Sequence, residues 1–389
     1  MKTTKKLAAV LVGALAAAIF TGCTPNVEIE DRAIVHAIGV DKSEEGYEVS
    51  LQVFATGGSG SDTPIDPSQP NMKVISGKGD TIYEGVKQCE LILGSDAFIG
   101  HNKLILFGKS LYNEDMDKLL DWFRKENENY LGVTVAYSET SAKDVLNVPL
   151  TEGSSTIENL DDIMKYAVTS GETVECDLLR LTNDLALPMG SGLVPVISVI
   201  EEKGGQQGGK TEGGSGGGGS AGKEQESVKY LRITKTAVLK DKRAVGIIDA
   251  DEAAGVLWIT GKMKKNAVML STEEQSFNAE IKKRYVKDEM EFKDGKPVLN
   301  LRIYAEMRIA EDVGSDVKKE ASQLAEKKIL EQCRKAAEKL LDEYKTDGLN
   351  IAKRVKFYLP TVYKSFEQDF DRLISATEIN IYVRCDRTD

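Results

Sequence analysis

The amino terminus constrains where and how the rest of the chain folds. Residues 7–20 form an uncharged, largely apolar run of 14 residues, preceded by the basic residues Lys2, Lys5 and Lys6. A membrane-spanning helix needs about 20 such residues, so this run is too short for one and has instead the length of the apolar region of a secretory signal. We therefore expect residues 1–22 to be a signal peptide and the remainder to fold outside the cytoplasm.

A cysteine follows this apolar run. Thr21-Gly22-Cys23 places two small residues before the cysteine, which resembles the lipobox of bacterial lipoproteins, with Phe20 where an aliphatic residue is usual. In such a lipoprotein the cysteine becomes the first residue and carries a diacylglyceryl group, whose two acyl chains hold a protein firmly to a bilayer. We expect lipidation at Cys23; the alternative is an ordinary signal peptide that happens to end near a cysteine.

The composition limits the partners of the mature chain. The 389 residues include 62 acidic and 51 basic side chains, which gives a net charge of −11. Nucleic-acid binding needs a clustered basic surface, and docking on anionic lipid needs a polybasic patch, so this charge argues against both. The hydrophobic share of 41% is enough for ordinary cores, and the length suggests two or three domains.

Strand and helix patterns divide the mature chain into three predicted domains. Residues 23–150 begin with a hairpin, and their later segments alternate between amphipathic helices and strands. Residues 151–265 form a middle domain, interrupted by a linker at 203–222 in which 11 of the 20 residues are glycine. A stretch so rich in glycine cannot repay the entropy of being ordered, and it lacks the spacing of a phosphate-binding loop.

The last predicted domain, residues 266–389, has the clearest pattern. Within residues 297–309, apolar residues occupy every second position from Leu299 to Ile309. Residues 316–344 form the longest predicted helix, with one apolar stripe and a Lys/Glu-rich opposite side. A membrane-surface helix is the alternative for 316–344, but neighbouring strands need a cover, so we expect it to pack on a sheet. The fold class is therefore α+β, with a mixed or antiparallel sheet packed with helices in each of the three domains.

Few residues suit catalysis or metal binding. His36 lies inside an apolar strand and His101 beside a glycine, so we interpret both as structural. The four remaining cysteines show no Cys-x-x-Cys spacing, which argues against zinc; a Cys333–Cys385 disulfide and reduced, buried thiols are the two alternatives, and we favour the thiols. Acidic pairs such as Asp161-Asp162 indicate a solvated face. We predict no catalytic, metal or cofactor-binding residues and no cofactor; the four cysteines are Cys89, Cys176, Cys333 and Cys385.

Several stretches together resemble the Ger(x)C family, the lipoprotein C subunits of nutrient germinant receptors in spore-forming Gram-positive bacteria. The resemblance runs through nearly the whole mature chain. Its first two elements are the lipobox at Cys23 and Glu30-Asp31-Arg32 leading into Ala33-Ile-Val-His-Ala-Ile-Gly-Val-Asp41. The third is Gly100-His-Asn-Lys-Leu-Ile-Leu-Phe-Gly108, with Trp122-Phe123-Arg124 and Ala142-Lys-Asp-Val-Leu146 after it. The fourth is Thr236-Ala-Val-Leu-Lys-Asp-Lys-Arg-Ala-Val-Gly246, followed by Gly255 to Gly261.

The resemblance implies a non-enzymatic protein on the outer face of the inner spore membrane. It implies integral membrane A-type and B-type receptor subunits as partners, and a part in converting nutrient binding into release from dormancy. It implies no catalytic residues, and only Cys23 is carried over as a site. We therefore expect a lipid-anchored scaffold or signal-coupling subunit that does not by itself bind a small molecule.

Two other functions are the alternatives. An extracytoplasmic solute-binding lipoprotein would need two similar α/β lobes around a cleft, and the strand and helix order fits that poorly. A secreted hydrolase that uses carboxylates has no support beyond the number of acidic residues.

Overall fold

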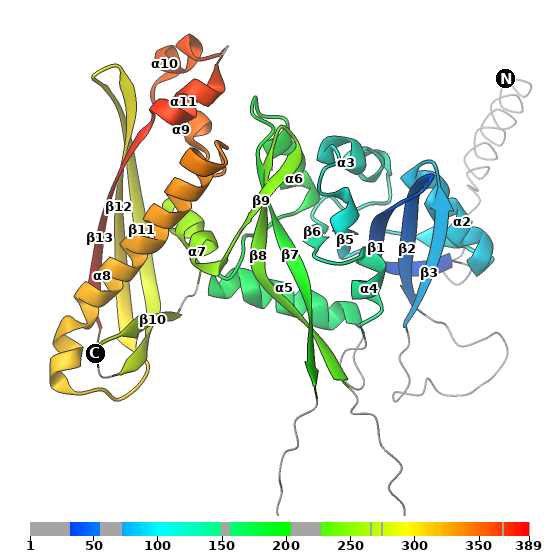
Figure 1. Ribbon diagram of the computed structural model, residues 1–389, viewed down its shortest axis with the longest axis horizontal. Helices are drawn as coiled ribbons and strands as arrows, with labels where there is room; N and C mark the ends of the chain where they lie inside the picture. The colour runs from blue at the N-terminus through cyan, green and yellow to red at the C-terminus, as the bar shows by residue number, and fades with distance from the viewer. Residues whose placement is uncertain are drawn as a thin grey trace, which may run out of the picture.

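The computed structural model describes residues 32–54, 72–148, 156–203, 227–264, 267–273, 275–367 and 369–388. These residues form one nine-stranded sheet and one four-stranded sheet, and helices pack against both (Figure 1). This confirms the predicted α+β class. Cys23 and the linker at 203–222, apart from Lys203 at a strand end, lie outside the described residues.

The nine-stranded sheet is mixed. Four strands in its middle run parallel, in the order β1-β5-β6-β7, and antiparallel strands extend it on both sides to give β3-β2-β1-β5-β6-β7-β8-β9, with β4 parallel to the start of β1. The strands are β1 (Arg32–Ser43), β2 (Gly46–Phe54), β3 (Met72–Gly79), β4 (Asp96–Phe98), β5 (Leu104–Phe107), β6 (Thr134–Ser138), β7 (Gly192–Lys203), β8 (Ser227–Lys240) and β9 (Arg243–Ile248).

Helices cover both faces of this sheet, which explains why its parallel strands are apolar on both sides. Every residue of β5 is buried, for example. One hydrophobic cluster joins the sheet to α2, α3 and α6, and another joins the opposite face to α4 and α5. The elements are α2 (Ile82–Leu93), η2 (Lys109–Leu111), α3 (Met116–Lys125), α4 (Ala142–Leu146), α5 (Thr156–Ser170) and α6 (Leu178–Leu185).

The continuity of this sheet differs from the expectation of one sheet per domain. Tyr137 of β6 pairs with Val196 of β7, and Ser138 pairs with Ile197, so strands from the predicted segments 23–150 and 151–265 join in one sheet. Parallel neighbours are connected by long crossovers, and the local periodicity of a sequence does not reveal which distant strands pair. The division of the chain into three domains stays a prediction.

The second sheet follows the pattern predicted for the carboxyl-terminal residues. Strands β10, β11 and β12 are antiparallel, and β13 runs parallel to β12. On β12, Leu299, Leu301 and Ile303 are buried, as the alternation predicted. The helix predicted at 316–344 is confirmed as α8, whose last turns widen into the π-helix η3. The bounds are β10 (Ala267–Ser271), β11 (Ser276–Lys293), β12 (Lys296–Ile309), α8 (Ser315–Ala337), η3 (Glu338–Glu343) and β13 (Glu378–Arg387).

Four helices complete the described fold. One of them, α7, directly follows β9 and packs against α8 of the second sheet. The other three lie between η3 and β13. Their bounds are α7 (Ala250–Ile259), α9 (Ile351–Tyr358), α10 (Pro360–Ser365) and α11 (Phe370–Ala376).

Candidate functional site at the junction of the two sheets

The two histidines occupy structural positions. His36 lies in β1 with its ring centroid 6.5 Å from that of Phe54. His101 lies in the turn after β4, where it meets the ring of Phe98 edge-on at 5.5 Å. Each imidazole therefore contacts an aromatic side chain.

The four described cysteines are all buried and unpaired, so Cys333 and Cys385 form no disulfide. Burial raises the pKa of Cys89 to about 11 and that of Cys385 to about 12, which keeps both thiols protonated at neutral pH. The acidic pair at 161–162 is at the surface, where Asp161 accepts from Lys165 Nζ at 2.6 Å. Within the described ranges, no group of three or more His, Cys, Asp or Glu side chains is arranged to hold a metal ion.

The crossing of α7 and α8 is a very close contact. A Cβ built on Gly255 of α7 would stand 2.1 Å from the backbone oxygen of Gln332 and 2.7 Å from the Cβ of Ala336. Real Cβ atoms essentially never approach another heavy atom within 3.0 Å. Only glycine therefore allows these two helices, one from each side of the junction, to approach so closely.

A second glycine makes room for an aromatic ring nearby. A Cβ on Gly246 of β9 would stand 2.2 Å from Cζ of Tyr344, which follows η3. The hydroxyl of Tyr344 donates to the backbone oxygen of Ile247 at 3.2 Å. The ring of Tyr344 thus lies flush on the last strand of the nine-stranded sheet.

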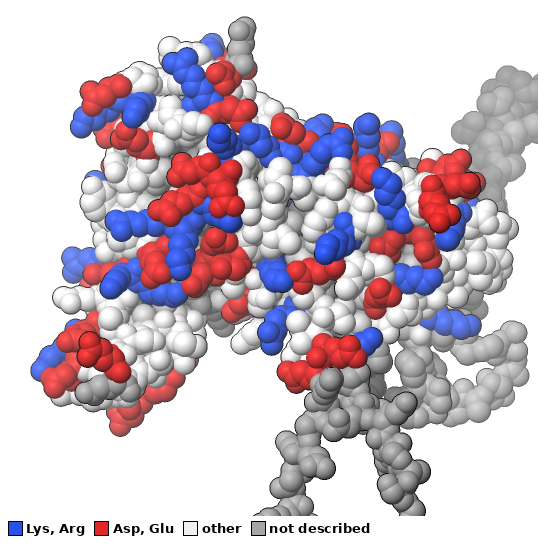
Figure 2. All heavy atoms as spheres, in the orientation of Figure 1, with Lys and Arg blue, Asp and Glu red and all other residues white. Residues whose placement is uncertain are grey.

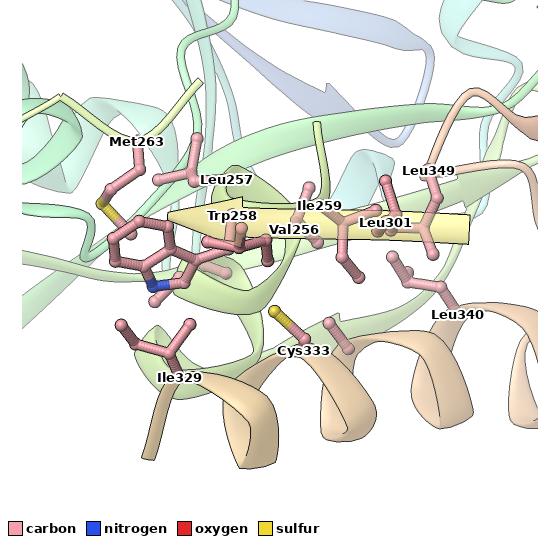
Figure 3. Close-up of a cluster of buried hydrophobic side chains, with 14 of the residues drawn as sticks. Val256, Leu257, Trp258, Ile259, Met263, Leu301, Ile329, Cys333, Leu340 and Leu349 are labelled. Atoms are coloured by element: carbon pink, nitrogen blue, oxygen red, sulfur yellow. The ribbon is translucent and has the colours of Figure 1, made fainter. Parts of the chain in front are cut away.

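Apolar packing at the junction is extensive (Figure 3). Trp258 of α7 is fully buried, and its cluster includes Ile329 of α8 and Leu301 of β12. The same cluster reaches Val238 and Ile248 in the nine-stranded sheet. Helix α7 therefore continues one sheet covalently and belongs to the hydrophobic core of the other.

A polar network lines the open side of this crossing. Asp251, in the first turn of α7, accepts from Lys328 Nζ at 2.8 Å and from Gln332 Nε2 at 2.9 Å. Burial opposes the ionisation of Asp251, but these two donors outweigh it, so the pKa of its carboxyl lies below the usual value. Burial, with the nearby charge of Asp251, raises the pKa of Glu172.

These residues line a cleft of about 600 Å³. It lies between the end of α5, the edge strand β10 and α8, and its walls carry both carboxylates and the lysines Lys327 and Lys328. Figure 2 shows the same mixture of acidic and basic side chains over the outer surface of α8. The cleft is thus polar and of mixed charge.

A buried polar cluster joins the two sheets on another side of the junction. Thr346 Oγ1 lies 2.8 Å from Ser191 Oγ and 2.9 Å from the backbone oxygen of Leu239. The carboxylate of Asp347 accepts from the backbone N–H groups of Ile351 and Ala352 at the start of α9. Burial nevertheless raises the pKa of Asp347 to about 7.

The junction was not predicted from the sequence. Gly246 and Gly255 belonged only to the family resemblance, and Tyr344 only to the apolar stripe of the helix predicted at 316–344. The run Ala253-Ala254-Gly255 in the middle of a helical segment is the one local signal, because small residues on a helix permit close packing.

Comparison with known proteins covers almost the entire chain. Residues 25–199 match the family described as Spore germination protein N-terminal domain, and residues 234–388 match that described as Spore germination B3/GerAC like, C-terminal. Spore germination protein B3 of Bacillus subtilis (strain 168) is 22% identical over 391 residues, 97% of this chain and 96% of the relative. Spore germination protein KC of the same organism is 20% identical over 400 residues, 95% and 90% of the two chains.

A solved structure shares the fold. The crystal structure of the GerBC protein matches with a TM-score of 0.57 at 17% identity, and the match covers 90% of this chain and 97% of that chain. In the described residues, no helix is both long and apolar enough to span a membrane. Since the two family matches follow one another in the expected order and together cover most of the chain, this chain belongs to the Ger(x)C family of spore germination proteins.

Proposed function

We propose that the chain is a lipid-anchored, non-enzymatic subunit of a nutrient germinant receptor complex and acts as a scaffold or signal-coupling component. The observation that carries this proposal is the match to Spore germination protein B3 over nearly the full length of both chains. In the proposal, Cys23 holds the chain to the outer face of the inner spore membrane through a diacylglyceryl group. Its partners there are the integral membrane A-type and B-type subunits.

The junction supports a coupling role. Gly255 and Tyr344 hold the two sheets in close contact, so a displacement of one sheet is resisted by backbone and ring atoms of the other. A partner that contacts either sheet would thereby influence the position of the other. Nothing in this role requires a reaction at the junction.

The anchor is tested by mass spectrometry of the amino-terminal peptide from spore membranes. We expect Cys23 to carry a diacylglyceryl group, and Cys23→Ala to lose it while Thr24→Ala keeps it. Without Cys23 the signal peptide could stay uncut and would itself hold the Cys23→Ala variant at the membrane. Release of Cys23→Ala from the membrane is therefore measured in a chain whose residues 1–22 are exchanged for an ordinary cleavable signal. Normal germination with a fully released protein would contradict the proposal.

Solute binding is the second candidate, and the cleft of about 600 Å³ is the observation that favours it. Pockets of this size hold small ligands in many proteins. Isothermal titration of the mature chain with amino acids and sugars separates the two functions. The coupling proposal predicts no tight binding, and a saturable, tight titration would favour the solute-binding protein.

A further inference from the structure

Two large aliphatic side chains are exposed side by side at the carboxyl end of α2. Leu91 is 75% exposed and Ile92 is 62% exposed. Among the large hydrophobic residues that the structure describes, they are the only adjacent aliphatic pair in which both are more than half exposed. The opposite side of α2 carries the residues that pack on the sheet, which are Ile82, Gly85, Val86 and Cys89.

This pair lies in the last turn of α2, shortly before the strand β4 that pairs with the start of β1. Helix α2 ends at Leu93 with Gly94 as its C-cap, and β4 starts two residues after Gly94 with Asp96, which pairs with Arg32 at the start of β1. Glu90 Oε1 accepts from the backbone N–H of Ala97 at 3.1 Å and so holds the last turn of α2 against β4. In Figure 1, α2 lies at the opposite end of the molecule from the four-stranded sheet.

The length of chain before Arg32 limits its distance from a membrane. Arg32 is nine positions after Cys23, and nine residue steps span at most about 30 Å when fully extended. If Cys23 is lipidated, as the proposed function holds, Arg32 lies within this distance of the bilayer surface. The exposed pair, which is five and four positions before Asp96, the partner of Arg32, is then within reach of the lipid.

We propose that Leu91 and Ile92 insert into the outer surface of the lipid bilayer and form a second membrane contact beside the anchor at Cys23. Moving aliphatic side chains from water to the boundary between headgroups and acyl chains lowers the free energy. Two contacts fix the orientation of the nine-stranded sheet relative to the membrane, whereas a single flexible tether does not. This inference rests on the proposed function because it takes the anchor as given.

The charges around the pair indicate which force holds the contact. Lys87 is paired with Glu90 at 2.5 Å, and Arg32 is paired with Glu128 at 2.6 Å. Asp96 adds a further negative charge nearby. With Lys87 and Arg32 paired, the described side chains named here have no basic excess to attract anionic lipid. We therefore expect the contact to depend on apolar insertion and to change little with salt.

The first experiment uses the lipidated mature chain bound to vesicles that contain brominated acyl chains, which quench tryptophan within the bilayer. In Leu91→Trp, we expect the added fluorescence to be quenched. In the matched control Phe357→Trp, which replaces a residue of α9 that is 78% exposed, we expect no added quenching. Equal quenching in the two variants, or quenching of Leu91→Trp only when the integral membrane subunits are present, would overturn the inference.

Mass spectrometry of Cys23 is done before this measurement, so that failure of the proposed function can be told apart from failure of the second membrane contact. If Cys23 carries no lipid, the proposed function fails. If Cys23 is lipidated and Leu91→Trp is not quenched, the anchor stands and only the second contact is wrong.

The second experiment measures the partition of the mature chain without its lipid, beginning at Thr24, onto neutral phosphatidylcholine vesicles. We expect Leu91→Ser with Ile92→Ser to lower the partition coefficient about tenfold. The control Tyr166→Ser with Phe357→Ser removes other exposed apolar side chains and is expected to leave it unchanged. An unchanged partition in the first variant, or binding that needs anionic lipid and disappears at high salt, would contradict the proposal.

Discussion

The backbone oxygen of Gln332 lies 2.1 Å from the position that a Cβ on residue 255 would occupy. Gly255 is in α7 and Gln332 is in α8, so the contact joins a helix that follows the nine-stranded sheet to the helix that covers the four-stranded one. A backbone oxygen cannot rotate away as a side chain does. The two helices would have to separate to admit even one methyl group.

Gly255→Ala is therefore expected to destabilise the protein, although alanine is the better helix former. We expect the free energy of unfolding in urea to fall by about 2 kcal/mol or more, because the overpacked crossing must open. Gly314→Ala is the matched control, since a Cβ there meets nothing within 4 Å, and its cost should be well below 1 kcal/mol. Equal losses in the two variants would show that the close approach at Gly255 is unimportant.

Gly246 and Tyr344 should behave as a coupled pair. Alone, Gly246→Ala forces the Tyr344 ring off β9, which we expect to cost about 1–3 kcal/mol. In a Tyr344→Ala background the same substitution should cost less than about 0.5 kcal/mol, because the obstructing ring is absent. A double-mutant cycle in urea measures this difference, and additive losses would contradict the contact.

The buried carboxyl of Asp347 is expected to make the free energy of unfolding depend on pH. Burial raises its pKa from 3.8 to about 7 in the folded protein, so the folded state holds a proton that the unfolded state releases at lower pH. The stability that this carboxyl contributes is fully present below about pH 4 and is lost as the pH rises towards 7. Between pH 4 and 8, the free energy of unfolding in urea should therefore decrease less for Asp347→Asn than for the wild-type chain.

The control for that series is Asp312→Asn. The side chain of Asp312 is 98% exposed, so this substitution should leave the fall in the free energy of unfolding as it is in the wild-type chain. If the free energy of unfolding falls as steeply with pH for Asp347→Asn as for the control, then the buried carboxyl of Asp347 does not titrate between pH 4 and 8.

Two polar contacts of the junction are expected to differ in strength. Asp251→Ala leaves the buried amide of Gln332 without its acceptor and should lower the free energy of unfolding by about 1–3 kcal/mol. Lys240→Ala removes an ion pair to Asp371, which is 62% exposed, and should cost less than about 1 kcal/mol. Chemical denaturation at low and high salt checks both, and a larger loss for Lys240→Ala would reverse this ranking.

The sequence was most informative where one periodicity persists over a long segment. The alternation of β12 and the apolar stripe of α8 predicted both elements and the packing of one on the other. The helix α9 was missed, since it is only eight residues long and so shows little periodicity. Strand β3 was also missed, because its glycines and lysines read as loop, and it lies at an edge of the sheet where one side needs no partner.

The junction could not be predicted from local pattern. Its contacts join residues such as Ser191 and Thr346, which are 155 positions apart, and burial of their hydroxyls depends on how the two sheets are placed. Neither the spacing of apolar residues nor a sequence motif predicts how the two sheets are placed relative to each other. The lipidation site at Cys23, by contrast, rests on sequence alone and stays a prediction.

The place of β1 in the sheet decides how the molecule responds to force. β1 is the first described strand, yet it lies in the interior of the sheet between β2 and β5, with β4 beside its first residues. A pull on Arg32 along the strand would shear backbone hydrogen bonds to both neighbours together, whereas an edge strand would peel away one bond at a time. Tension entering at the amino terminus is thus shared by the middle of the nine-stranded sheet.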